Sequence, residues 1–182
     1  MSNDRGPGFI RFLHGVSPDG RLLAYIGMDL LPDGGVRTNV YTVPTDGGPD
    51  AQLTNSEASH DGSVFSPDGE WIYFNSERGS DVAGHAQLFR MRLDGSGIEQ
   101  LTDDERVNWF PHVSPDGTQV VYISFPTGTL GHPADLDVVI RLLGPGGVGS
   151  DVVQLFGGQG TINVPSWAPD SRRFAYVAYP LS

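Results

Sequence analysis

The histidines are the side chains of this sequence best suited to do chemistry. The chain has five histidines and no cysteine, so disulfide bonds, thiolate catalysis and cysteine metal sites are excluded. An imidazole can transfer protons near neutral pH, and it is also a common metal ligand. The five residues are His14, His60, His85, His112 and His132.

No local motif of the sequence assigns a catalytic role or a cofactor to these histidines. Residues 144–149 spell G-x-G-x-x-G, but the dinucleotide fingerprint needs a helix directly after the glycines, and residues 151–155 resemble a strand instead. The sequence has no G-x-S-x-G elbow, no H-E-x-x-H helix and no EF-hand loop. A Ser-His-Asp triad is not excluded, because its members need not be close in sequence. Whether the protein is an enzyme is therefore left open.

The elements that must position the histidines are marked by a recurring turn. The string S-P-D-G occurs at residues 17–20, 66–69 and 114–117, and A-P-D-S follows at 168–171. Proline presets φ, aspartate bonds its own backbone and glycine allows positive φ, so each string predicts a tight turn in which the aspartate is a turn former rather than a ligand. An aromatic residue follows 8 positions after each turn begins, within a strand-like segment: Tyr25, Phe74, Tyr122 and Tyr176.

Three landmarks of the repeat stay in register along the chain. The turns begin at residues 17, 66, 114 and 168, which gives steps of 49, 48 and 54. Strands that end in a glycine turn follow at 41–47, 89–95 and 140–146, and Leu-Thr or Leu-Phe pairs follow at 53–54, 101–102 and 155–156. In the second repeat, the predicted strands are 63–66, 70–75, 87–93 and 98–102.

Four short strands in a repeat of this length are typical of a propeller blade. No segment shows sustained helical periodicity. We therefore predict an all-β fold, a β-propeller of four-stranded antiparallel blades, with about three and a half to four blades in a single domain over residues 1–182. In the fourth repeat we expect only two strands, 164–167 and 172–178.

The repeat resembles that of TolB-type β-propellers, and the resemblance covers residues 14–179. The segments N-W-F-P-H at 108–112 and 157–167 are similar to a soluble TolB-like subfamily with six blades. The resemblance implies a propeller that docks a protein or a small ligand at one face and at its central channel. The sequence departs from the subfamily pattern by lacking two blades and an N-terminal TolB domain.

Alternation of loops between the two faces of a propeller places all five histidines on one face. The repeated turns lie on the opposite face, whereas longer and irregular loops, which often carry function, lie on the histidine face. A structural role is the alternative for Trp109, as a filler between blades, and for His112, as a buried histidine. The residues expected to bind a ligand at this face are Arg78, His85, Asn108, Trp109, His132 and Asn163.

Three functions are consistent with this arrangement. The first is a module that binds a protein or small-molecule ligand. The second is a hydrolase, lactonase or lyase that depends on a divalent metal at the central channel, with Asn108 and Asn163 as neutral oxygen ligands. Calcium prefers oxygen ligands and imidazole suits transition metals, so the identity of the ion stays open, with calcium as one choice. The metal ligands of this second function would be His14, His60 and His112. The third function is architectural, as a propeller fragment that self-association completes.

Composition limits the partners. With 11 basic and 22 acidic residues the net charge is -11, which disfavours nucleic acid. No apolar run is long enough to span a membrane, and residues 1–5 lack the features of a signal peptide. We expect a cytoplasmic protein, or a periplasmic one if a signal was lost together with missing blades.

An incomplete ring would leave exposed strand edges, so we expect a homo-oligomer, a dimer that completes the propeller.

Overall fold

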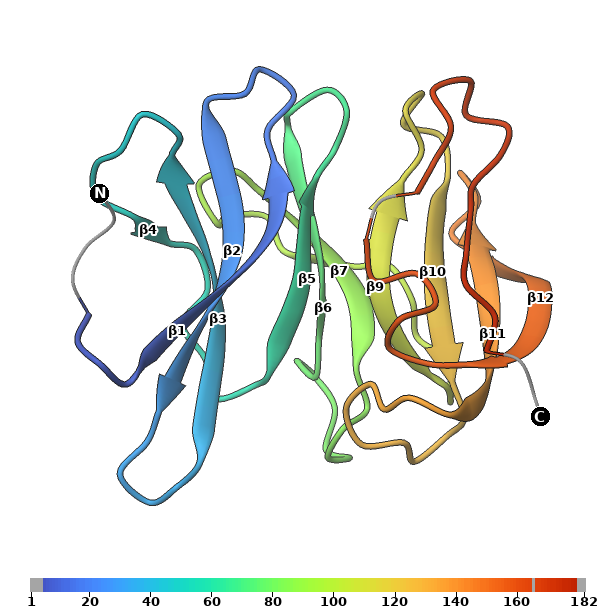
Figure 1. The fold of residues 1–182 in the computed structure, drawn as a ribbon, viewed down its shortest axis with the longest axis horizontal. Coiled ribbons are helices and arrows are strands. Elements are labelled where there is room, and N and C mark those ends of the chain that lie inside the picture. Colours follow the sequence, from blue (N-terminus) through green and yellow to red (C-terminus); the bar gives the residue numbers. More distant parts are fainter. Residues whose placement is uncertain (1–4, 165, 180–182) are drawn as a thin grey trace.

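The fold is built from three four-stranded antiparallel sheets and contains no helix among the described residues (Figure 1). The computed structural model describes residues 5–164 and 166–179. Each sheet is one blade, and its strands follow one another in chain order. This arrangement confirms the predicted propeller architecture, and the chain contains about three blades.

The strand bounds agree closely with the repeat. Blade 1 consists of β1 (Phe9–Val16), β2 (Leu22–Leu30), β3 (Val36–Pro44) and β4 (Ala51–Gln52). Blade 2 consists of β5 (His60–Phe65), β6 (Trp71–Ser76), β7 (Gln87–Arg92) and β8 (Glu99–Gln100). Blade 3 consists of β9 (Val107–Val113), β10 (Val120–Phe125), β11 (Leu136–Leu143) and β12 (Gly149–Gly157).

The fourth repeat is less regular than expected. The predicted strands 164–167 and 172–178 are represented by a single β-bridge between Trp167 and Phe174. Pro165, which belongs to the first of them, lies outside the described residues. The rings of Trp167 and Phe174 nevertheless meet edge to face and pack against the core of blade 3. The segment therefore covers blade 3 without forming a sheet of its own.

The recurring turn is held together by its serine and aspartate. In the first copy, Ser17 Oγ donates to Asp19 Oδ1 and accepts from the backbone N–H of Leu22 at 2.8 Å. The Asp19 carboxylate also accepts from the N–H of Arg21 at 3.0 Å. The second and third copies repeat this pattern. The aspartates of these turns thus form the turns, as the sequence predicts.

The Leu-Thr pair explains why two of the outer strands are only two residues long. In blade 2, the backbone N–H of Leu101 bonds Leu88 O, and the N–H of Leu88 then bonds Thr102 Oγ1 at 2.9 Å instead of a backbone carbonyl. Thr54 does the same for Val40 in blade 1. Blade 3 has Phe156 at the corresponding position, and there β12 continues in the ladder to Gly157.

Apolar side chains join each blade to the next. Ala24 and Ile26 of blade 1 pack with Ile72 and Phe74 of blade 2 in one buried cluster. A second cluster joins blade 2 to blade 3, and a third joins blade 3 to the segment around Ile162. Successive residues of a strand point to opposite faces of its sheet, so blade 2 packs on blade 1 with one face and on blade 3 with the other. The innermost strands β1, β5 and β9 are thereby fixed beside one another.

Candidate functional site

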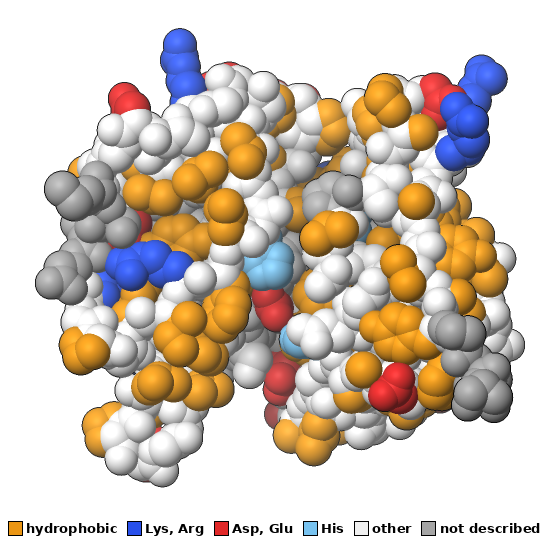
Figure 2. All heavy atoms as spheres, viewed as in Figure 1, with side chains coloured by type: hydrophobic (Ala, Val, Ile, Leu, Met, Phe, Trp, Pro, Cys, Tyr) orange, Lys and Arg blue, Asp and Glu red, His pale blue; other side chains and the backbone are white. Residues whose placement is uncertain are grey.

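A pocket of about 690 Å³ opens where the three innermost strands approach each other. It is lined by residues 11–14 of β1, residues 59–61 at the start of β5, Trp109 and Phe110 of β9, and residues from two later loops. Figure 2 looks into a hollow between the two halves of the molecule, with histidine and acidic side chains at its floor. The volume lies within the range of 300–1,000 Å³ or so that is common for small-molecule sites.

A single carboxylate at the pocket joins three blades. Asp61, at the start of blade 2, accepts from His14 Nε2 of blade 1 at 2.9 Å. Its other oxygen lies 3.5 Å from His132 Nε2, which comes from the loop between β10 and β11 of blade 3. The backbone N–H of Gly62 donates to the same carboxylate at 2.7 Å. Three elements that are far apart in sequence therefore meet at Asp61.

These contacts keep Asp61 ionised. Burial alone would raise the pKa of Asp61, but the hydrogen bonds from His132 and His14 outweigh burial and hold the pKa well below its usual range. Asp61 in turn orients both imidazoles through their Nε2 atoms. At many binding and catalytic sites, a carboxylate bonded to one nitrogen of a histidine ring fixes the orientation of that ring in this way.

Aromatic rings fix the position of His132. The ring of His132 meets the ring of Trp109 edge to face, with centroids 4.6 Å apart, and it lies 5.1 Å from the ring of Phe110. Phe110 adopts a φ of 53°, which is unusual for a residue with a side chain. Its N–H bonds Asn75 Oδ1 of blade 2 at 3.3 Å. Blade 2 therefore helps to hold the aromatic wall of the pocket.

Irregularities in the inner strands turn the polar side chains toward the pocket. The pairing of β1 with β2 shifts between Leu13 and Gly15, and the pairing of β5 with β6 shifts between Asp61 and Val64. Such bulges re-aim side chains and often lie next to functional sites. Gly62 has a φ of 66°, and a Cβ there would lie 2.7 Å from Asn75 Oδ1. Glycine is therefore required beside Asp61.

Five of the predicted site residues line this one pocket. His14, His60, Trp109, His132 and Asn163 lie there together. His60 is nearly buried, its Nε2 lies 2.9 Å from Ser56 Oγ, and burial together with the charge of Arg78 lowers the pKa of His60 to about 4. His60 is thus a neutral part of the wall at neutral pH.

Three other predicted residues serve the framework and do not line the pocket. His112 is buried, and its Nε2 donates to Ile162 O at 2.7 Å. Burial, only partly offset by this bond, lowers the pKa of His112 to about 4. His85 Nε2 bonds Asp104 O at 2.8 Å in the loop that leads to blade 3. Arg78 lies beside His60 and is not part of the pocket lining.

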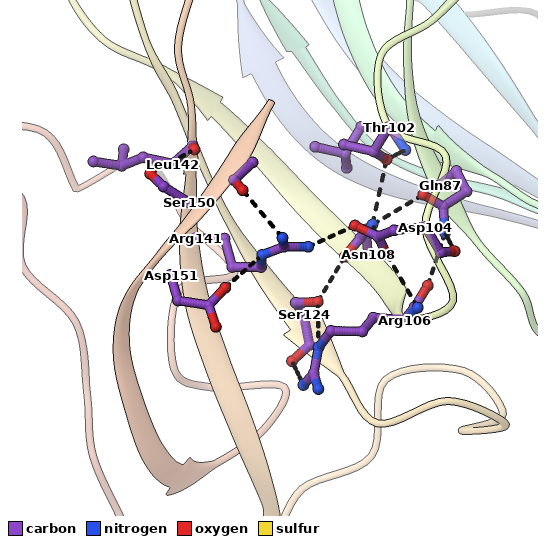
Figure 3. Close-up of polar contacts among 12 residues, drawn as sticks. Gln87, Thr102, Asp104, Arg106, Asn108, Ser124, Arg141, Leu142, Ser150 and Asp151 are labelled. Carbon is purple, nitrogen blue, oxygen red and sulfur yellow. Dashed lines mark hydrogen bonds and ion pairs between the residues drawn. The ribbon is translucent and has the colours of Figure 1, made fainter. Parts of the chain in front are cut away.

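Asn108 is the centre of a polar network between blades 2 and 3 (Figure 3). Its Nδ2 donates to Gln87 Oε1 at 2.9 Å, and its Oδ1 accepts from Ser124 Oγ at 2.7 Å. Asp104 links this network to Arg141 of β11. Asn108 is fully buried and joins two blades through these contacts.

The three histidines expected to bind a metal do not come together as a metal site. Within residues 5–164 and 166–179, no group of three or more His, Cys, Asp or Glu side chains is arranged to hold a metal ion. The Nε2 of His112 bonds a backbone carbonyl, and the Nε2 of His14 bonds Asp61.

The described part of the chain contains no helix long and apolar enough to cross a membrane.

Asp61 is the residue of the site that sequence reasoning missed. It directly follows His60, which is a candidate from the sequence, and a carboxylate next to a histidine at the start of an inner strand was the available signal. The two contacts of Asp61 reach 47 residues back and 71 residues forward (61 − 14 and 132 − 61). No local spacing in the sequence reveals contacts of this range.

Comparison with known proteins agrees with this architecture. Residues 12–138 match the family model of the TolB beta propeller domain. An uncharacterized protein of Agrobacterium fabrum is 44% identical over 170 residues, which cover 92% of this chain and 55% of the relative. The chain thus spans about half the length of that relative.

Two solved structures are similar to the chain. A protein from Agrobacterium tumefaciens, described as a candidate TolB, superposes with a TM-score of 0.85 at 41% identity over 98% of this chain and 61% of the other. TolB from Acinetobacter baumannii gives a TM-score of 0.64 at 18% identity over 92% of this chain and 37% of the other, a likeness of fold alone. The family match covers well over half of the sequence, and the chain therefore belongs to the TolB β-propeller family.

Proposed function

We propose that the protein is a binding module that takes a small ligand or a segment of a partner protein into the pocket at Asp61. The observation that carries this proposal is the convergence of His14, Asp61 and His132 from three blades on one pocket of about 690 Å³. Pockets that combine apolar walls with a few convergent polar groups are the usual form of binding sites.

The two faces of the molecule differ in a way that favours this pocket. The face with the repeated turns uses its serines and aspartates to satisfy its own backbone. At the pocket, by contrast, side chains of different blades contact one another, and His14 and His132 keep 17% and 26% of their side-chain surface exposed. The polar groups of the pocket are therefore accessible to a ligand.

A library screen by thermal unfolding tests the proposal. A ligand that binds only the folded state at 100 times its Kd adds roughly 2.7 kcal/mol and raises the melting temperature by several degrees. We expect that compounds which stabilise the protein lose this effect in His132→Ala and keep it in His85→Ala. The two histidines occupy corresponding loops of blades 3 and 2, but His85 does not line the pocket. Stabilisation that survives in His132→Ala would contradict the proposal.

A further inference from the structure

The pocket is poor in carboxylates although the chain is strongly acidic. The chain carries 22 acidic and 11 basic residues, whereas the described lining residues include one carboxylate, Asp61, together with Arg11 and three histidines. The negative charge of Asp61 faces His14, His132 and the N–H of Gly62. The net negative charge of the protein repels anions, and this repulsion is therefore weaker at the pocket than elsewhere on the surface.

The two imidazoles each have a second nitrogen that can serve a ligand. Their Nε2 atoms point to Asp61. Within the described residues, no hydrogen-bond partner holds Nδ1 of His14 or His132, and neither atom is among the buried unpaired atoms of the molecule. Nδ1 of a neutral ring bonded through Nε2–H is an acceptor, and it becomes a donor when the ring takes up a proton. An anion bound at the pocket would favour the protonated form of a neighbouring imidazole.

Asp61 is the one carboxylate among the described lining residues that would oppose an anion, and it already contacts both imidazoles. Arg11 of β1 lines the same pocket, and Asn163 and Gln159 supply neutral amides from the segment after β12. The aromatic residues of β9 and the apolar residues of β2 add no charge. His60 is part of the lining and His112 is buried outside it, and burial lowers the pKa of each to about 4, so they stay neutral. The charge of Arg78 contributes to the lowered pKa of His60.

The rest of the wall is suited to an apolar body. Phe12, Ile26, Met28, Trp109, Phe110 and Val164 form most of it. We propose, as an extension of the proposed binding function, that the pocket binds a carboxylate attached to an apolar or aromatic body, and that the His14–Asp61–His132 cluster takes up a proton when it does so. The carboxylate belongs either to a small organic acid or to the carboxyl terminus of a polypeptide.

Calorimetry with a matched pair of probes tests the inference. We expect 3-phenylpropionate to bind more tightly than the neutral 3-phenylpropionamide at pH 6. Its affinity should fall between pH 6 and pH 8 by up to roughly tenfold per pH unit, since the histidine must be protonated while the carboxylate stays ionised over this range. The heat measured in buffers of different ionisation enthalpy should reveal proton uptake. Equal affinity for the two probes, or no change with pH, would overturn the inference.

Variants separate the inference from the function on which it rests. His14→Asn and His132→Asn should lose most of the preference for the carboxylate, His85→Asn should keep it, and thermal unfolding verifies that each variant is folded. If both probes bind equally and both are lost in His132→Asn, the pocket is a ligand site and only the ligand class is wrong. If neither probe binds, the inference fails, and the library screen decides on the binding function separately.

A peptide pair distinguishes the two sources of the carboxylate. Gly-Gly-Phe is compared with the same peptide amidated at its carboxyl terminus. Tight binding of the free peptide, lost on amidation, supports a polypeptide carboxyl terminus as ligand. Binding of 3-phenylpropionate without binding of either peptide supports a small organic acid. If the amidated peptide binds as well as the free one, carboxylate recognition is contradicted.

Discussion

His14 and His132 differ from the other three histidines in their surroundings. Both share the carboxylate of Asp61 and remain partly exposed in the pocket. His60 and His112 are buried and pair with a hydroxyl and a backbone carbonyl, respectively. His85 bonds a loop carbonyl outside the pocket. At the scale of single residues, His14 and His132 are therefore set apart by a shared carboxylate and by their exposure at the pocket.

The two buried histidines make the stability of the protein depend on pH. Their pKa is lowered to about 4 in the folded state from 6.5, so the unfolded state binds more protons between pH 4 and pH 6.5. Their contribution is complete above pH 6.5 and is lost as the pH falls toward 4, by at most about 1.4 kcal/mol per pH unit for each histidine. Asp61 contributes in a lower window, below the ordinary pKa of an aspartate, because its pKa is lowered.

Urea unfolding at several pH values checks this prediction. We expect the unfolding free energy to decrease from pH 7 to pH 5. His112→Gln should reduce that slope by about half, since glutamine can still donate to Ile162 O but does not titrate. The slope, rather than the absolute stability of the variant, is the quantity to compare. A slope that is the same in both proteins would show that His112 titrates normally in the folded state.

At the scale of the strands and turns, much of the architecture follows from the sequence. The S-P-D-G turns and the aromatic strands after them predicted the propeller, because turn chemistry and strand composition are local properties. The ends of β4 and β8 were not predictable in the same way, since the side chain of Thr102 replaces a backbone carbonyl in the ladder. The site was predicted only in part. Asp61 joins His14 and His132 through tertiary contacts that no spacing reveals.

Replacing Thr102 tests the role of the Leu-Thr pair. Thr102→Val keeps the shape of the side chain but leaves the backbone N–H of Leu88, a buried residue, without its acceptor. We expect a loss of about 1–3 kcal/mol in the free energy of unfolding, because an unsatisfied buried donor carries its full desolvation cost. Thr102→Ser, which retains the hydroxyl, should lose much less. Equal stability of the two variants would show that the hydroxyl is dispensable.

At the scale of the whole molecule, apolar side chains are exposed on the first blade of the row and on the segment that follows the last one. Ile10, Leu30 and Val36 of blade 1 are exposed, and so are Tyr176 and Val177 beyond blade 3. Blades within the chain bury such surfaces against each other. The molecule thus has exposed apolar side chains at both ends of the row of blades.

We expect the chain on its own to associate head to tail through these two surfaces. Sedimentation velocity should show a species of twice the chain mass at micromolar concentration. A charge at one end, in Val36→Asp or in Val177→Asp, should shift the protein toward the monomer. A mixture of the two variants retains one intact pair of surfaces and should recover part of the dimer. A monodisperse monomer of the unaltered chain would contradict this expectation.

The measurement that tests the account most directly is NMR mapping of ligands on the labelled protein. The central claim is that ligands bind at the pocket that holds His14, Asp61 and His132 rather than at the face of the repeated turns. We predict that compounds from a fragment library perturb the imidazole resonances of His14 and His132 and the indole resonance of Trp109, and leave the backbone resonances of Asp68 and Asp116 unchanged. Perturbations concentrated at Asp68 and Asp116, with the imidazole resonances unmoved, would contradict the assignment of the functional face.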